Sequence, residues 1–216
     1  QGVYLKDLLL QAGVKPEAEQ LFSRSLDGWT SGFPIELALD GRDALLAIGM
    51  NGEPLPLVHG FPARLIVPGI YGYVSATKWL SEIEINKWSD AYGYWIPRGW
   101  ARDAPIKTQS RIDVPRSGAT VAAGQTRVAG VAWAQHTGIA KVEVRIDSEE
   151  WSEAILSDDI SDDTWRLWTF DWQATAGKHT IQVRATDKSG YTQTETVTSV
   201  APDGATGWHT RRVSVA

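Results

Sequence analysis

The second half of the chain is dominated by a two-residue alternation of apolar and polar side chains. Segments 141–147 and 181–186 carry valine, isoleucine or alanine at every other position, with polar or charged residues between them. Successive side chains of a strand point to opposite faces of a sheet, so this pattern predicts strands that are buried on one face. Turn signals at 176–178 and 187–190 separate the segments at short intervals. Several short strands with this spacing predict a β-sandwich of the immunoglobulin type over residues 106–216.

Residues 1–105 show a different pattern, in which helical and strand periodicities are interspersed. Apolar residues at helical spacing before Gly13 predict a short amphipathic helix over residues 4–12. A proline suits the first position of a helix, so Pro34 predicts a second helix that ends near Leu39. The expected fold class of the whole chain is therefore α+β. The strands expected in this half span 45–50, 64–67 and 83–85, and the proline-rich stretch 97–118 is expected to be an extended connector.

The composition argues against several classes of function. A formal net charge of −5 disfavours a nucleic-acid-binding surface, and no apolar run approaches the roughly 20 residues of a membrane span. The chain has no cysteine, so it has neither disulfides nor thiolate ligands. Its four histidines share no metal-ligand spacing, and the common hydrolase and nucleotide-binding motifs are missing. The acidic stretch 158–163 lacks the glycine and distal glutamate of a calcium loop and is expected to be solvated. No metal site is expected from these residues alone.

The region 51–79 contains the strongest candidates for chemistry. His59, Arg64 and Lys78 are set among prolines and glycines, and Arg64 opens an apolar run. An arginine at the start of a buried strand needs an anionic partner, because an unpaired buried charge is costly. Stiff turns hold such donors in place, and nearby glycines let backbone amides approach a ligand closely. The pattern therefore predicts a site for a phosphate-bearing ligand.

Four motifs in this region closely resemble the sulfite oxidase family of molybdenum-cofactor oxidoreductases. They are Met50-Asn-Gly-Glu-Pro-Leu-Pro56, His59-Gly-Phe-Pro-Ala-Arg64, Val67-Pro-Gly69 and Lys78-Trp-Leu80. The resemblance continues into the predicted sandwich, which is similar to the family's dimerisation domain and ends in a Trp208-His209 pair. It implies that residues 1–105 are the C-terminal part of a molybdopterin-binding oxidoreductase domain. Residues 106–216 would then be an immunoglobulin-like dimerisation domain that forms a homodimer.

The same resemblance implies a set of cofactor contacts. The side chains that match the family's molybdopterin-binding positions are Asp27, His59, Arg64 and Lys78, and backbone contacts would come from Ala76 and Thr77. The family holds molybdenum through a cysteine thiolate, a soft ligand that suits such a metal. The matching cysteine would lie upstream of the segment at Gly2. We therefore expect the chain to be a C-terminal portion that is inactive alone, and we expect the complete protein to carry the molybdenum-molybdopterin cofactor.

Two departures from the family pattern affect the expected substrate. Trp29 takes the place of an active-site tyrosine and is the candidate for the substrate pocket, and Ala201 takes the place of an arginine before the terminal Trp-His pair. Both changes disfavour an anionic substrate such as sulfite. The Tyr71-Gly-Tyr73 and 95–100 elements are most similar to the bacterial membrane-anchored branch, which implies a membrane-anchored or extracytoplasmic parent protein. The electron-transfer partner is not indicated.

Two other classes of function are left open by the sequence. Eleven tryptophans beside a predicted β-sandwich also fit a module that binds carbohydrate or a protein partner without redox activity. A purely structural assembly domain that has lost its cofactor is the third possibility. The tryptophans expected to be core or interface residues are Trp133, Trp151, Trp165, Trp168 and Trp172.

Overall fold

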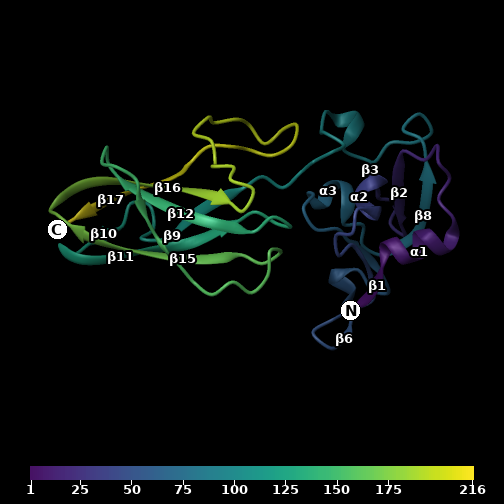
Figure 1. Cartoon of the computed structure of the whole chain (residues 1–216), viewed down its shortest axis with the longest axis horizontal. Helices are drawn as coiled ribbons and strands as arrows, with labels where there is room; N and C mark the ends of the chain where they lie inside the picture. The colour runs from purple at the N-terminus through teal and green to yellow at the C-terminus, as the bar shows by residue number, and fades with distance from the viewer. The chain divides into compact units, whose positions relative to one another are not determined.

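The computed structural model describes residues 1–216, which divide into two compact units (Figure 1). The first unit comprises Gln1–Pro105 together with Ala201–Asp203. The second comprises Ile106–Val200 and Gly204–Ala216. The short segment Ala201–Asp203 thus belongs to the first unit, although it is far from the rest of that unit in sequence.

The first unit is built from two three-stranded antiparallel sheets, a short hairpin and several short helices (Figure 1). One sheet has the strand order β1-β4-β7, and the other has the order β3-β2-β8. The elements in chain order are β1 (Gly2–Tyr4), α1 (Leu5–Ala12), β2 (Gln20–Ser25), β3 (Thr30–Pro34), α2 (Glu36–Leu39), β4 (Leu45–Ala47), β5 (Gly49–Met50), β6 (Glu53–Pro54), the 3-10 helix η1 (Leu57–His59), β7 (Arg64–Ile66), α3 (Gly72–Ser75), β8 (Leu80–Asn86) and the 3-10 helix η2 (Ile96–Arg98).

Helix α1 is confirmed with bounds close to those expected. It buries Leu5 and Leu9 in the core of the first unit, and Gly13 follows it with φ of 83°. The Gly13 amide donates a hydrogen bond to the Leu9 carbonyl over 3.0 Å, which closes the last turn. Glycine adopts this left-handed conformation without a steric cost, so the chain can leave the helix there.

Three expectations for the first unit and the connector are wrong in detail. Pro34 is the last residue of β3, and α2 begins two residues later at Glu36. The strand expected over 45–50 is divided into β4 and β5 at Ile48, whose side chain is 57% exposed. The stretch 97–118 contains a regular strand, β9 (Gln109–Val114), because prolines and glycines flank this strand and obscure its alternation.

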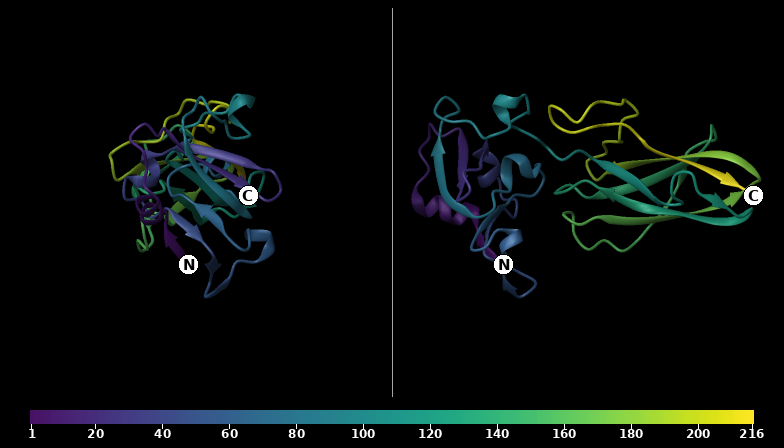
Figure 2. Two further views of the ribbon diagram at one scale, coloured as in Figure 1. Left: turned by 90° about the vertical axis from the view of Figure 1, so that its right-hand side faces the viewer. Right: turned by 180° about the vertical axis from the view of Figure 1, so that it is seen from behind.

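The second unit is a sandwich of two sheets (Figure 2). One sheet has the order β10-β17-β16-β12-β13, and the other has the order β14-β15-β11-β9. The elements are β9, β10 (Thr120–Val121), β11 (Gly124–Trp133), β12 (Ile139–Ile146), β13 (Ser152–Glu153), β14 (Ile155–Leu156), β15 (Arg166–Ala174), β16 (Gly177–Asp187) and β17 (His209–Val215). Helical residues make up 10% of the chain, so the α+β class describes a mostly β structure only loosely.

The alternation seen in the sequence defines the core of the second unit. Val142, Val144 and Ile146 are 0%, 1% and 5% exposed, and residues between them face outward. Trp168, 1% exposed, is the largest fully buried side chain, whereas Trp165 is 47% exposed. Burial of a large aromatic side chain contributes strongly to core stability. No helix of either unit is long and apolar enough to cross a membrane.

Candidate functional site

Four of the residues expected to form the site line one cavity in the first unit. The cavity has a volume of about 300 Å³ and is formed by the end of β2, the turn before β3, the start of α3 and the loop before β8. Its lining residues are Ser25, Asp27, Trp29, Gly72, Ala76, Lys78 and Trp79, and we call it the Asp27–Lys78 pocket. One acidic and one basic side chain therefore share a cavity that is walled by two tryptophans.

The β2–β3 turn fixes the carboxylate of Asp27. The Trp29 amide donates to Asp27 Oδ1 over 3.0 Å, and the Asp27 amide faces Ser25 Oγ at 3.4 Å. The hydrogen bond from the Trp29 amide, and then that from the Ser25 side chain, lower the pKa of Asp27 below its usual value. Hydrogen bonds that favour the charged form have this effect, so Asp27 is an anion at neutral pH.

The side chain of Lys78 has no carboxylate in ion-pair contact. Its Nζ donates to the Val58 carbonyl over 3.2 Å and lies 4.4 Å from the ring centre of Trp79. Trp79 Nε1 in turn donates to the Leu57 carbonyl over 2.8 Å. Both contacts tie the loop before β8 to helix η1. The ammonium group is therefore held at the cavity by neutral partners, and its charge is left for a ligand.

Arg64 and His59 lie beside this pocket but do not line it. Arg64 is half-buried at the start of β7, and its guanidinium group contacts only backbone carbonyls, including that of His59 at 3.3 Å. Burial lowers the pKa of Arg64, because desolvation disfavours the charged form. His59 is exposed at the end of η1. The structure thus brings the arginine close to the pocket and leaves the imidazole at the surface.

The first side-chain carbons of Lys78 and Arg64 both lie close to Gly60. A Cβ atom placed on Gly60 would lie 3.0 Å from Lys78 Cβ and 3.2 Å from Arg64 Cβ. Gly60 has φ of 107°, a conformation that glycine adopts without strain. Because Gly60 has no side chain, the Cβ atoms of Lys78 and Arg64 can both lie close to it. The close packing and the positive φ together explain why the His-Gly-Phe-Pro-Ala-Arg motif has a glycine at position 60.

Trp29 is part of an aromatic cluster in the first unit. Its ring centre lies 5.1 Å from that of Tyr94 and 6.4 Å from that of Trp95. Arg98 stacks on Tyr94 at 3.6 Å, which fixes the outer ring of the cluster. These contacts hold the indole of Trp29 as a rigid wall of the pocket, with no hydroxyl group at this position.

Thr77 and Ala201 occupy different places from the pocket-lining residues. Thr77 is fully buried between Ala76 and Lys78. Ala201 is the first residue of the segment Ala201–Asp203, which belongs to the first unit. In this segment the Pro202 carbonyl accepts hydrogen bonds from the Ala101 amide at 2.9 Å and from the Tyr73 hydroxyl at 3.3 Å. Burial raises the pKa of Tyr73 to about 12. This phenol therefore stays protonated over the physiological range.

Ser25, Gly72 and Trp79 line the pocket but were not among the expected site residues. Trp79 lies inside the Lys78-Trp-Leu80 motif, and Gly72 lies in the glycine-rich stretch that was expected to approach a ligand. Ser25 lies in no motif, and only the pairing of β2 with β8 brings it to Lys78.

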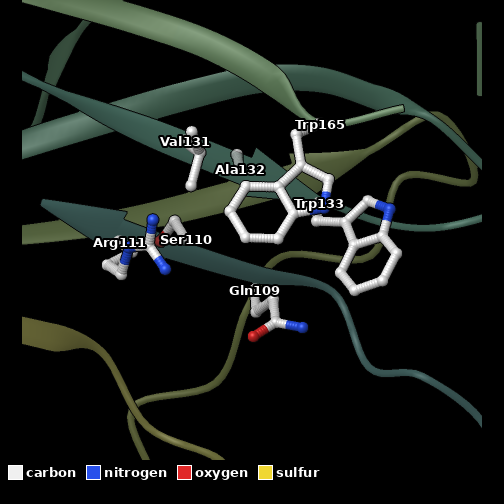
Figure 3. A pocket seen from close by; sticks show the side chains of 7 residues that line it. All are labelled: Gln109, Ser110, Arg111, Val131, Ala132, Trp133 and Trp165. Carbon is white, nitrogen blue, oxygen red and sulfur yellow. The ribbon is translucent and has the colours of Figure 1, made fainter. Parts of the chain in front are cut away.

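A second, smaller cavity lies in the second unit and contains none of the residues expected to bind the cofactor (Figure 3). Its volume is about 140 Å³. The rings of Trp133 and Trp165 are 5.6 Å apart at its edge, and the Arg111 guanidinium carbon lies 5.1 Å from the Trp165 ring centre. The other polar lining residues are Gln109 and Ser110, and the Ser110 hydroxyl donates to Gln193 Oε1 over 2.7 Å.

The acidic stretch expected to be solvated forms ion pairs. Asp159 and Asp162 contact Lys188 at 3.0 and 2.5 Å, and Asp159 also contacts Arg166 at 3.1 Å. No group of three or more His, Asp or Glu side chains is arranged to hold a metal ion in either unit.

Comparison with known proteins gives matches to both units. Residues 1–95 match the oxidoreductase molybdopterin binding domain, and residues 109–183 match the bacterial Ig domain. Mitochondrial sulfite oxidase of Mus musculus is 30% identical over 234 residues, covering 92% of this chain and 42% of the relative. An uncharacterized oxidoreductase of Bacillus subtilis, YuiH, is 40% identical over 100 residues, covering 46% of this chain and 49% of the relative.

A solved structure supports the same relationship. The sulfane dehydrogenase SoxCD from Paracoccus pantotrophus is similar with a TM-score of 0.72 and 28% identity, covering 89% of this chain and 52% of that chain. The chain thus spans about half the length of these relatives. The matches do not favour the alternative of a carbohydrate- or partner-binding module. They support a place for the chain among the molybdopterin oxidoreductases of the sulfite oxidase family, with the molybdopterin-binding match in its first unit and the bacterial Ig-domain match in its second.

Proposed function

We propose that the first unit binds part of a molybdopterin cofactor and that the complete protein is an oxidoreductase. The observation that carries this proposal is the half-buried Arg64, which has no carboxylate partner. A cation in such a place is costly unless an anion joins it. Lys78 lies on the other side of Gly60, also without a carboxylate in contact. Two cationic side chains that begin on either side of one glycine suit the phosphate group of a pterin.

The chemistry of the donor set fits the organic part of the cofactor. Arg64 and Lys78 supply positive charge, and the Asp27 carboxylate supplies acceptors for ring N–H groups of a pterin. The chain offers no thiolate, because it has no cysteine. We therefore propose that the soft ligand to the metal comes from outside these 216 residues. The residues described here would hold the pterin and its phosphate.

Each pocket residue has a distinct role in this proposal. Lys78 and Arg64 hold the anionic group, and Asp27 orients the heterocycle. Trp29 walls the space beside it and excludes water, and it has no hydroxyl group that would donate a proton to a substrate oxygen. When bound, the molybdenum centre supplies two-electron redox chemistry. The missing hydroxyl group at Trp29 and the alanine at position 201 favour a substrate other than sulfite.

The test is the molybdenum content of a longer protein that includes the upstream residues. We expect close to one equivalent of molybdenum per chain in the wild type and at least tenfold weaker cofactor retention in Arg64→Ala. A charge-assisted hydrogen bond contributes about 1.5–3 kcal/mol, and about 1.4 kcal/mol corresponds to a factor of ten. The matched control is Arg24→Ala, because Arg24 lies in the same unit and forms exposed ion pairs with Glu82 and Glu84. Equal retention in both variants would contradict the proposal.

We also propose a homodimer that forms through the second unit. Ile155, Trp165 and Leu167 are 69%, 47% and 58% exposed on or next to the strands β14 and β15. Exposed apolar groups on one sheet favour an interface, and a two-fold dimer uses the same face twice. Leu167→Glu is expected to lower the mass measured by light scattering to that of a monomer. Ile160→Glu, at an exposed apolar loop residue, is expected to leave the dimer intact. A monomeric wild type at high concentration would contradict this proposal.

A further inference from the structure

Three buried hydroxyl groups form a closed set of contacts next to the Asp27–Lys78 pocket, where Thr77 lies in the chain between the lining residues Ala76 and Lys78. Ser23 Oγ lies 3.1 Å from Ser31 Oγ and 2.8 Å from Thr77 Oγ1, and Ser31 Oγ lies 2.8 Å from Thr77 Oγ1. All three residues are fully buried. The three oxygens therefore form a triangle inside the first unit, which we call the hydroxyl triad.

The triad satisfies its own hydrogen-bonding groups. A hydroxyl group has one donor and two acceptor positions, so three of them in a ring each donate once and accept once. No donor is left over inside the core, where an unpaired polar group is costly. Removal of one hydroxyl group opens the ring and leaves another without an acceptor. The three contacts are therefore interdependent.

The triad connects two neighbouring strands to a loop that is distant from them in sequence. Ser23 and Ser31 are directly opposite each other on β2 and β3. Thr77 lies in the loop between α3 and β8. The loop is also attached on its other side, because the Thr77 carbonyl accepts from the Leu65 amide over 3.0 Å and the Leu80 amide donates to the Ala63 carbonyl over 2.9 Å. Thr77 is thus held through both its side chain and its backbone.

The burial of Thr77 fixes the side of the loop on which its side chain lies. The segment from Ala76 to Trp79 is bent, with φ of −113° and ψ of 43° at Ala76 and φ of 49° at Trp79. Thr77 points into the core, and Ala76 and Lys78 line the cavity. Hydrogen bonds are directional, so the triad fixes the rotation of this segment, whereas an apolar contact of equal volume would tolerate several orientations.

We propose that Ser23, Ser31 and Thr77 are positioning residues that hold Lys78 at the anion-binding side of the pocket. The inference rests on the proposed function, because Lys78 acts there on a phosphate-bearing ligand. Rotation of the Thr77 side chain away from the triad would carry the Lys78 backbone with it. The anion would then lose one of its two cations.

The test is a double-mutant cycle with inorganic pyrophosphate as the anion probe. Binding to the 216-residue chain is followed by ¹⁵N NMR titration for the wild type, Thr77→Val, Lys78→Ala and the double variant. Thr77→Val keeps the volume and removes the hydroxyl group. We expect it to weaken binding about fivefold to tenfold, and to have no further effect when Lys78 is already alanine. Thr77→Ser restores the hydroxyl group and is expected to restore most of the affinity.

A second readout needs no ligand. The NMR order parameter of the Lys78 amide is expected to fall from about 0.85 in the wild type towards 0.6 in Thr77→Val. Ser31→Ala opens the same ring from another strand, and it replaces Thr77→Val if that variant does not fold. A loss of affinity that persists in the Lys78→Ala background, or an unchanged order parameter, would overturn the inference.

The two proposals fail in different ways. If the wild type and Arg64→Ala bind pyrophosphate equally weakly, the cofactor-binding proposal is contradicted, and the order parameter still decides the role of the triad. If Arg64→Ala weakens binding but Thr77→Val does not, the cofactor-binding proposal stands and the positioning role is refuted.

Discussion

Replacement of Gly60 by alanine tests how closely the side chains of Lys78 and Arg64 pack around this residue. Gly60 follows the 3-10 helix η1 with φ of 107°, and Gly99 follows the 3-10 helix η2 of the same unit with φ of 89°. Each amide donates to the carbonyl three residues earlier, over 3.0 Å at Gly60 and 3.1 Å at Gly99. The two glycines therefore have the same local role, and Gly99→Ala is a matched control.

The surroundings of the two glycines differ. A Cβ on Gly60 would lie 3.0 Å from Lys78 Cβ, 3.1 Å from Lys78 Cα and 3.2 Å from Arg64 Cβ, whereas a Cβ on Gly99 would have no atom within 4 Å. Both variants carry the left-handed backbone cost of about 1–2 kcal/mol. Only Gly60→Ala adds a packing cost of about 1–3 kcal/mol, because a neighbouring backbone atom must move. We expect a loss of unfolding free energy of about 1–2 kcal/mol for Gly99→Ala and about 2–5 kcal/mol for Gly60→Ala.

The same substitution is expected to weaken anion binding. Relief of the contact moves the Lys78 backbone away from Gly60, which separates the two cations. Urea denaturation followed by circular dichroism measures the stability of each variant, and pyrophosphate titration measures its affinity. Only Gly60→Ala is expected to lose affinity. Equal losses of stability in the two variants, or wild-type affinity in Gly60→Ala, would refute the packing argument.

Two further predictions concern the second unit. Gly130→Ala is expected to destabilise it by about 3 kcal/mol or more, because the added Cβ would overlap the Arg111 carbonyl and lie 2.9 Å from Trp168 Cζ2. The rate of amide hydrogen exchange should rise in β9 and β11. An unchanged exchange rate would contradict this prediction. The hydrogen bond with Asp147, followed by that to a backbone carbonyl, raises the pKa of His179 above 6.5. The stability from this shift is fully present below pH 6.5 and is lost as the pH rises through the raised value. The unfolding free energy of the wild type relative to His179→Asn should therefore decrease with rising pH, and a constant difference between about pH 5 and pH 9 would rule this out.

The strands of the second unit could be predicted from the sequence for a physical reason. Residues 141–147 are buried on one face only, so apolar and polar residue types alternate along the strand. Strand β2 of the first unit lacks this signal, because five of its six residues are buried. Strand β3 is also almost wholly buried. A strand buried on both faces has no two-residue alternation, which is why these two strands were missed.

The candidate site was also only partly predictable from the sequence. The motif around His59, Arg64 and Lys78 identified the segments that carry charge, because the order of their glycines and prolines can be read directly from the sequence. Which of these residues share a cavity depends on the pairing of β2 with β8 and on the path of the loop before β8. His59 was grouped with the other two, but its side chain stays exposed.

The sequence by itself determined the two-part organisation, the sandwich core and the positions of the cations, because each depends on residues that are close in the chain. Only the tertiary structure decided that Asp27 and Trp29 face Lys78, and that Ser23, Ser31 and Thr77 meet next to the pocket. The two contacts that Thr77 makes in the triad join residues 54 and 46 positions apart. Side chains so far apart are brought together by strand pairing and by the burial of polar groups that must find partners, and neither leaves a local pattern in the chain.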